Sequence, residues 1–278
     1  MNARLLVGTA VLALPLALAG CPKQNNKPLT VSQARQALDE ASVASQAEAL
    51  TQNEVEISTN FTIGDAVQTA AQNLRDFIAS QLPCAAITLN NATLSIEYGA
   101  NPGNCTYRGQ TFSGKTSVTI ARNDSGDVEV QHHWDGLSNG KVSVTGDATV
   151  TWSLANETRH VVHTATWTRV SDGLTATGSG DRTQEPLAGG ITEGFQVDGS
   201  RSWKGQSGQW DLAIDGVQMR WVDPVPQAGS YTLGTPFEKS LGLSFSRVNA
   251  NTIKVTVTNG NRSFHFNVTK AGTISQSG

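Results

Sequence analysis

Apolar and polar residues alternate along most of the chain, which is the pattern of β-strands with one buried and one solvated face. The alternation extends from Ala85 to about Lys270. It is clearest over residues 141–154, where seven apolar or small side chains occupy every second position. At ~3.3 Å per residue, a strand over that stretch would be ~46 Å long, well above the usual length. The pattern predicts a sheet of long antiparallel strands.

Before residue 85 the apolar residues recur at helical spacing instead. Residues 30–33, Thr-Val-Ser-Gln, have capping-box spacing and predict an Ala-rich, weakly amphipathic helix that extends to about Leu50. Residues 62–65 resemble a second cap, and the apolar residues behind them predict a helix with one face to bury. Pro83 ends this second helix.

Three Asx-Gly pairs predict two-residue hairpin turns, and each turn fixes which residues face one another across the two strands. Between Ala121 and Val128 a longer loop is expected. The predicted facing pairs are Trp210 with Trp221, Leu212 with Met219 and Ile214 with Val217 around Asp215-Gly216; Val255 with Phe264 and Ile253 with Phe266 around Asn259-Gly260; and Trp167 with Gly178 around Asp172-Gly173.

A short pattern of apolar residues at alternate positions followed by glycine recurs, ending at Gly146, Gly178 and Gly199. We interpret each glycine as a bulge or bend in a long twisted sheet. The predicted fold class is α+β, mostly β. Two N-terminal helices precede a long antiparallel β-meander of roughly 10–12 strands, which forms a curled sheet, a sandwich or a barrel-like sheet.

The first 21 residues follow a third pattern, in which Arg4 precedes an apolar run from Leu5 to Leu18. A spanning helix needs ~20 apolar residues, so this run is typical of a cleaved signal peptide. The segment ends in Leu18-Ala19-Gly20-Cys21 and thereby resembles the lipobox of bacterial lipoproteins. The resemblance implies that residues 1–20 are removed and that acyl chains on Cys21 hold the protein on a membrane. An ordinary secretion signal and an uncleaved buried helix are the alternatives.

The lipobox resemblance implies a location in the bacterial cell envelope. Pro22 follows Cys21, in place of the Asp that signals inner-membrane retention in enterobacteria, and this favours the outer membrane. The side of that membrane stays open. The expected segments are a lipoprotein signal peptide (1–20), a lipidated tether (21–29), a helical segment (30–82), an antiparallel β domain (83–270) and a flexible tail (271–278).

The chain has three cysteines, and lipid on Cys21 leaves Cys84 and Cys105 as one pair. In an oxidising compartment we expect these two to form a disulfide, which closes a loop of ~20 residues and stabilises the fold by roughly 3 kcal/mol on the chain-entropy model. Two free thiols are the alternative. The cysteine spacing is not that of a zinc site.

Charge excludes some partners. Removal of residues 1–20 removes Arg4, so the mature chain has 19 Lys and Arg against 23 Asp and Glu, a formal charge of −4. Such a weak acidic balance gives no electrostatic footprint for nucleic acid or for anionic lipid.

The histidines are the first candidates for chemistry. His132 shares a strand face with Val130 and Trp134, and His163 shares one with Trp167. These two histidines could meet only if their strands came close on the inner side. Hydrogen-bonded structural histidines are the favoured interpretation, so no metal site is predicted.

Carboxylates are scattered along the strands rather than grouped. Asp124 and Asp127 flank a turn and lack the ligand count of an EF-hand. Asp181 with Glu185, or Asp198 with Asp211, would have the residue types of a glycosidase pair, although polar strand positions usually form the solvated face. The chain has no G-x-S-x-G, HExxH or P-loop motif. We therefore predict no catalytic residues, no cofactor and no enzyme activity.

The expected function depends on what covers the apolar face of the sheet. If the helix over residues 64–82 packs on it, the face is a closed core; if the face is only partly covered, it becomes a groove for an acyl chain or another lipid. The closed core is the favoured interpretation. The residues that would line such a groove are Trp134, Val144, Trp152, Trp167, Trp210 and Trp221.

From the sequence we expect a lipid-anchored envelope protein with a non-catalytic structural or binding role. Its partners would be the membrane, through the acyl chains, and an envelope protein or lipid, with no nucleic acid. One alternative is a carrier of lipid or another apolar ligand on the concave sheet face. Another is a carbohydrate-binding or carbohydrate-active surface protein that uses Trp203, Trp210 or Trp221.

Overall fold

The computed structural model describes residues 27–59, 65–153, 157–220, 223–269 and 273–277. The chain begins with two helices, α1 (Val31–Ser58) and α2 (Val67–Gln81). The strands that follow are β1 (Ala86–Asn90), β2 (Thr93–Tyr98), β3 (Thr106–Tyr107), β4 (Gln110–Thr111), β5 (Ser113–Arg122), β6 (Val128–Ser138), β7 (Val142–Ser153), β8 (Thr158–Arg169), β9 (Thr175–Leu187), β10 (Gly190–Gly205), β11 (Gly208–Arg220), β12 (Asp223–Thr235), β13 (Lys239–Asn249), β14 (Thr252–Asn259), β15 (Arg262–Thr269) and β16 (Ile274–Gln276).

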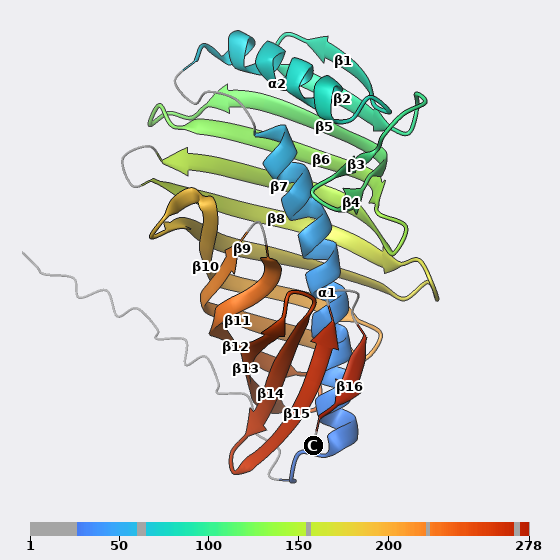
Figure 1. Cartoon of the computed structure of the whole chain (residues 1–278), viewed down its shortest axis with the longest axis vertical. Helices are drawn as coiled ribbons and strands as arrows, with labels where there is room; N and C mark the ends of the chain where they lie inside the picture. The colour runs from blue at the N-terminus through green and yellow to red at the C-terminus, as the bar shows by residue number, and fades with distance from the viewer. Residues whose placement is uncertain (1–26, 60–64, 154–156, 221–222, 270–272, 278) are drawn as a thin grey trace, which may run out of the picture.

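Fourteen of these strands form one antiparallel sheet in which every strand lies beside its neighbours along the chain. Only the short β3–β4 hairpin stands apart, inserted between β2 and β5. Strands β1 and β16 are the two edges, and the sheet between them is open and curled (Figure 1). The predicted long antiparallel meander is confirmed, with more strands than the expected number.

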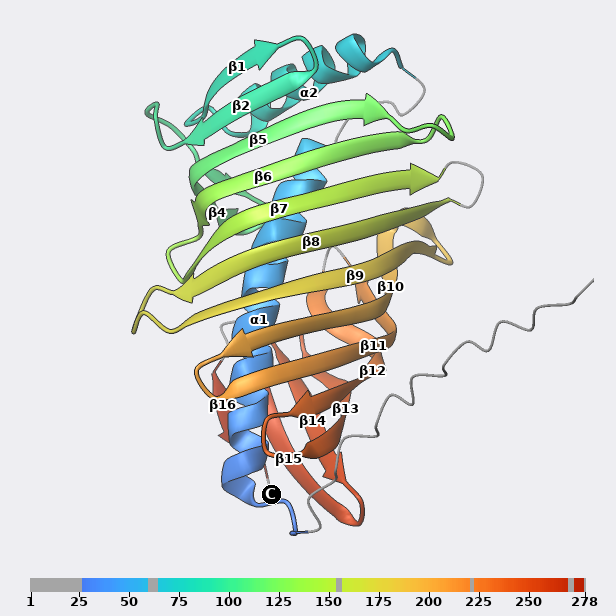
Figure 2. The same ribbon diagram turned by 180° about the vertical axis from the view of Figure 1, so that it is seen from behind.

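Helix α1 lies in the concave face of the curled sheet, and the strands pass around it (Figures 1 and 2). Five of its thirteen buried residues are alanines, which let the helix approach the sheet closely. The predicted capping box is confirmed: Thr30 accepts a hydrogen bond from the Gln33 backbone N–H at 3.2 Å. The helix continues to Ser58, eight residues beyond the expected end, because residues 51–58 carry side chains that find partners on the sheet.

Helix α2 packs over β1, β2 and β5 at one end of the sheet, on the same face as α1. The second helix therefore covers only that end of the apolar face, and α1 covers most of the rest. Residues 62–64 of its predicted cap lie outside the described residues, and its N-cap Ala66 makes no side-chain hydrogen bond. The helix ends at Gln81, just before Pro83, as predicted. Its buried face is small: Ala70, Ala71, Leu74 and Ile78.

One predicted hairpin is wrong. Asp215 and Gly216 lie inside β11, and Trp210 faces Trp203 of β10. Gly216 has the positive φ that a tight turn would need. Instead of a turn, the structure has an irregularity in the pairing of β11 with β12 at Gly216. Gly229 of β12 lies so close that a Cβ on it would be 2.5 Å from the Gly216 carbonyl oxygen. The glycines allow a bulge between two long strands rather than a turn.

The turn at Asp172-Gly173 exists, but the register of its strands differs from the predicted one. Trp167 faces Ala176, two residues from the expected Gly178. The loop is longer because Asp172 receives hydrogen bonds from Arg169 and from the Leu174 backbone N–H.

The hairpin predicted at Asn259-Gly260 exists, but its two-residue loop lies one residue later, at Gly260 and Asn261. Asn259 pairs with Arg262, so Val255 faces Phe266. Asn259 stays in the strand because its side chain donates a hydrogen bond to the Ser240 carbonyl at 2.9 Å. Ile253 therefore faces Val268.

The recurring glycines have different roles. The register shifts beside Gly199, so the predicted bulge is confirmed there. A second shift, between Trp134 and Leu137 of β6, lies opposite Gly146. Gly178, in contrast, pairs regularly with both neighbouring strands. A Cβ at Gly178 would lie 2.9 Å from the Trp167 ring, so this glycine makes room for an aromatic side chain.

Cys84 and Cys105 form the predicted disulfide, with their Cα atoms 5.4 Å apart. The bond ties the chain just after α2 to the start of the β3–β4 hairpin. In the part of the chain that the structure describes, neither helix is long and apolar enough to cross a membrane.

Candidate functional site

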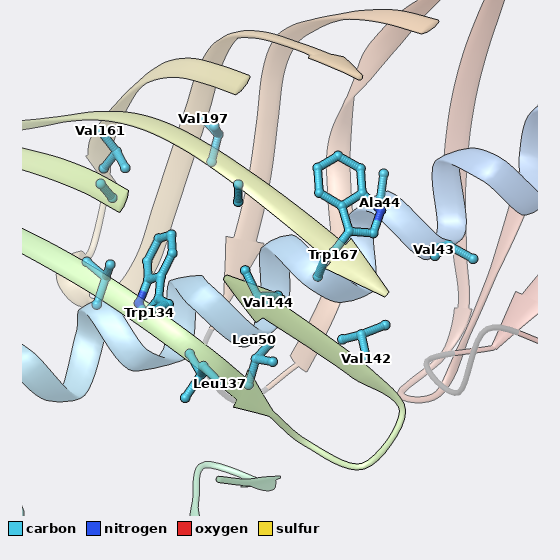
Figure 3. Close-up of a cluster of buried hydrophobic side chains, with 14 of the residues drawn as sticks. Val43, Ala44, Leu50, Trp134, Leu137, Val142, Val144, Val161, Trp167 and Val197 are labelled. Atoms are coloured by element: carbon cyan, nitrogen blue, oxygen red, sulfur yellow. The ribbon is translucent and has the colours of Figure 1, made fainter. Parts of the chain in front are cut away.

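The predicted groove residues lie in the core between α1 and the sheet. Trp134, Val144, Trp167 and Trp210 are all buried, and Figure 3 shows the first three together with Leu50 of α1. Trp152 packs at the edge of this core. The side chain of Trp221 lies outside the described residues.

A cavity of about 20 Å³ remains beside α1, lined by residues that include Ala44, Glu48, His163 and Trp203. A space of this size holds about one water molecule, far less than an acyl chain. The concave face is therefore filled by α1.

A polar stripe runs along the buried side of α1. Glu48, Gln52 and Glu56 recur every fourth residue and so lie on one face of the helix. Here the helix meets the inner faces of β8, β9 and β10. The stripe places carboxylates and an amide where most helices carry apolar residues.

Three buried arginines on neighbouring strands face this stripe. Arg159 of β8, Arg182 of β9 and Arg201 of β10 are each at most 8% exposed. From β8 to β9, and again from β9 to β10, the arginine lies one inward-facing position further along the strand direction. The three guanidinium groups therefore form a diagonal row that follows the helix.

The arginines pair with the carboxylates of α1. Arg159 pairs with Glu56, and Arg182 pairs with Glu48. Arg201 Nη1 lies 3.8 Å from Glu48 Oε2. Gln52 Oε1 accepts a hydrogen bond from Arg182 Nη2 at 3.0 Å. One helix turn therefore holds two arginines from two strands.

Burial changes the acid–base properties of this cluster. Loss of water around Arg182, and then the nearby charge of Arg201, lower the pKa of Arg182 to about 9, so it stays charged at neutral pH. The same two causes lower the pKa of His163 to about 4. His163 Nε2 lies 3.5 Å from Glu48. We therefore count His163 as a neutral neighbour of Glu48 and not as a charged partner.

A second cluster surrounds Glu54, which is fully buried on another side of α1. Its Oε2 accepts a hydrogen bond from Trp134 Nε1 at 3.0 Å and lies 3.1 Å from His132 Nδ1. Thr116 donates a hydrogen bond to Oε1. Burial, and then the charge of Glu54, raise the pKa of Tyr98 well above its usual value. This cluster ties α1 to β5 and β6.

The two inward histidines do not meet. His132 and His163 are on strands β6 and β8, and Ala148 of β7 lies between them in the register. Each histidine faces a different glutamate of α1. Among the described residues, no group of three or more His, Cys, Asp or Glu side chains could hold a metal ion.

The candidate carboxylates lie on the convex side or in turns. Asp181 pairs with exposed His160 at 2.6 Å rather than with Glu185. Asp198 accepts a hydrogen bond from the Gly216 backbone N–H. In the loop before Val128, Asn123 accepts backbone hydrogen bonds from Ser125 and Asp127, which is ordinary turn chemistry.

The interactions of these two clusters can hold a helix in place. Ser58 Oγ lies 3.4 Å from His132 Nδ1, but it donates its hydrogen bond to the Glu54 carbonyl, and the same histidine nitrogen faces the Glu54 carboxylate. This buried contact is therefore not the arrangement of a nucleophile whose base is oriented by a third group.

The arginines and their glutamate partners were not among the predicted site residues. The signal that could have found them is that Arg159, Arg182 and Arg201 occupy inward positions of neighbouring strands, where a charge needs a buried partner.

Comparisons with protein-family models, with curated proteins and with solved structures find no match to this chain.

Proposed function

We propose that this chain is a lipid-anchored, non-catalytic protein of the bacterial cell envelope, with the outer membrane favoured, and that its convex sheet face contacts another envelope component. The main supporting observation is that α1 fills the concave face and is held there by buried ion pairs. The broad surface left for a partner is then the convex side.

The convex side has the composition of a solvated contact surface. On β6, β7, β8 and β9, the outward positions carry polar side chains except for Val162 and Leu187. Pairs such as His133 with Asp147 and Thr166 with Thr177 connect neighbouring strands across this face. Long paired strands keep these groups in a regular array, which suits recognition of an extended partner.

The alternatives find less support. A lipid carrier would need α1 to leave the sheet, which would separate Glu48 and Glu56 from buried arginines. A carbohydrate-binding protein needs exposed aromatic rings, whereas Trp203 and Trp210 are buried and stack on each other.

The proposal can be tested in intact cells with a photo-crosslinking amino acid. We would place it at Gln131 or Thr164, both exposed on the convex face, and at exposed Asn73 of α2 as the matched control. We expect one discrete adduct from both convex positions and none from the control. Equal adducts from all three positions, or none from any, would contradict the convex-face assignment.

The same cells test the anchor. Globomycin blocks removal of lipoprotein signal peptides, so we expect the precursor that retains residues 1–20 to accumulate. Mature protein should carry acyl mass on Cys21 and remain in the membrane fraction. A processed, unacylated protein in the presence of globomycin would refute lipidation while leaving the crosslinking result interpretable.

A further inference from the structure

The buried ion pairs along α1 do not balance. Arg159 has Glu56 as its own partner, whereas Arg182 and Arg201 share the single carboxylate of Glu48. A buried charge that lacks an opposite charge of its own is costly, because the surrounding protein cannot replace the lost water. The part of the cluster around Glu48 therefore has one positive charge in excess.

Neighbouring ionisable groups do not supply the missing negative charge. His163 stays neutral at neutral pH, because burial and then the charge of Arg201 lower its pKa to about 4. Burial raises the pKa of Tyr231, so its hydroxyl is neutral as well. Glu40, nearer the start of α1, accepts a hydrogen bond in the β10–β11 turn, and Glu54 has its own donors on another side of the helix.

Arg201 has the weaker partners of the two arginines that share Glu48. Its Nη1 lies 3.8 Å from Glu48 Oε2, beyond hydrogen-bond distance, and donates to the Ala44 carbonyl at 3.4 Å. Its Nη2 donates to Ser45 Oγ at 3.4 Å. Among the described residues, the Nε atom of Arg201 has no hydrogen-bond partner. The residue is only 8% exposed, so bulk water does not supply the missing bonds.

Arg201 also lines the cavity of about 20 Å³ beside α1. Glu48 and His163 lie in the same wall, and the Thr51 hydroxyl there already donates to carbonyls of α1. Figure 3 shows part of the apolar wall between α1 and the sheet. The apolar side chains that line the cavity are Ala44, Ala47, Val144, Ala165, Trp167 and Trp203.

We propose that this cavity binds a single chloride ion beside Arg201, which balances the positive charge that Glu48 leaves over. A space that holds about one water molecule suits a monatomic ion and excludes phosphate or an organic acid. Two guanidinium groups attract the ion and one carboxylate repels it, so the net interaction is favourable. Bound chloride then helps to hold α1 against β9 and β10.

Thermal unfolding of the full chain, purified in detergent and followed by tryptophan fluorescence, tests this site. Sodium chloride or bromide is compared with sodium gluconate at the same ionic strength, because gluconate is too large for the cavity. A ligand that binds only the folded state stabilises it, so the unfolding midpoint should rise by roughly 3 °C in either halide and then saturate. Equal midpoints in halide and gluconate at every concentration would overturn the proposal.

Three variants of nearly unchanged shape separate this site from general salt effects. Gln52→Glu adds a carboxylate where the amide oxygen already accepts hydrogen bonds, and it should remove most of the halide response. Gln36→Glu makes the same change at an exposed position of α1 and should leave the response intact. Glu48→Gln should increase it, because two arginines then lack a carboxylate. Equal halide responses in the Gln52 and Gln36 variants would contradict a site beside Arg201.

Discussion

Glu48→Leu is expected to lower the free energy of unfolding by about 3–5 kcal/mol, the usual cost of removing one partner from a buried ion pair. The substitution leaves Arg182 and Arg201 buried beside an apolar side chain, although their pKa values are already lowered by burial. Urea unfolding followed by tryptophan fluorescence measures the effect.

Two comparisons make this prediction specific. Asp39→Asn on the same helix removes an exposed carboxylate that lies 3.5 Å from Arg169, and it should cost at most about 1 kcal/mol. The double variant Glu48→Leu with Arg182→Leu should recover part of the loss, because fewer uncompensated charges remain. A cost for Glu48→Leu no larger than that of Asp39→Asn would show that the ion pairs do not hold α1.

Trp203→Ala should have a similarly large effect, about 3–5 kcal/mol, because it removes a large side chain from a close-packed core. Trp203 is buried and stacks on Trp210, with ring centroids 6.3 Å apart. Its Cβ lies next to the bare backbone of Gly178, so the residue opposite it on β9 offers no side chain to fill the space. Thermal unfolding of the purified chain measures the loss.

The matched control is Val162→Ala on the convex side, where Val162 is 41% exposed. Substitutions at such surface positions usually change stability by no more than about 0.5 kcal/mol. If both variants melted at the same temperature, the concave face would not be the core of this protein.

The sheet was predictable because alternation has a direct physical cause. An inner face that must be dry requires apolar residues at every second position, and β7 shows this from Val142 to Trp152. The disulfide was also predictable, since the expected lipidation of Cys21 left only Cys84 and Cys105 to pair. The strand register at the turns was less predictable, because Asp172 and Asn259 make side-chain hydrogen bonds that alter the loops.

The position of α1 could not be predicted from its own sequence. Its alanines and glutamates give only a weakly amphipathic pattern, which is typical of a solvated helix. The partners that make Glu48 and Glu54 suitable for a buried position lie more than 60 residues away in the chain. Local periodicity carries no information about such pairs. Arginines at inward positions of the strands do indicate them, because a buried charge needs a partner.

Among the described residues, α1 occupies the concave face, and the cavity of about 20 Å³ that remains beside it is too small for an acyl chain. Native mass spectrometry of the unacylated protein, exported by a cleavable secretion signal and purified gently from cells, tests it directly. We expect the mass of the polypeptide alone. A stoichiometric additional mass that extracts into organic solvent as lipid would contradict a filled concave face, because the cavity of about 20 Å³ beside α1 has no room for an acyl chain.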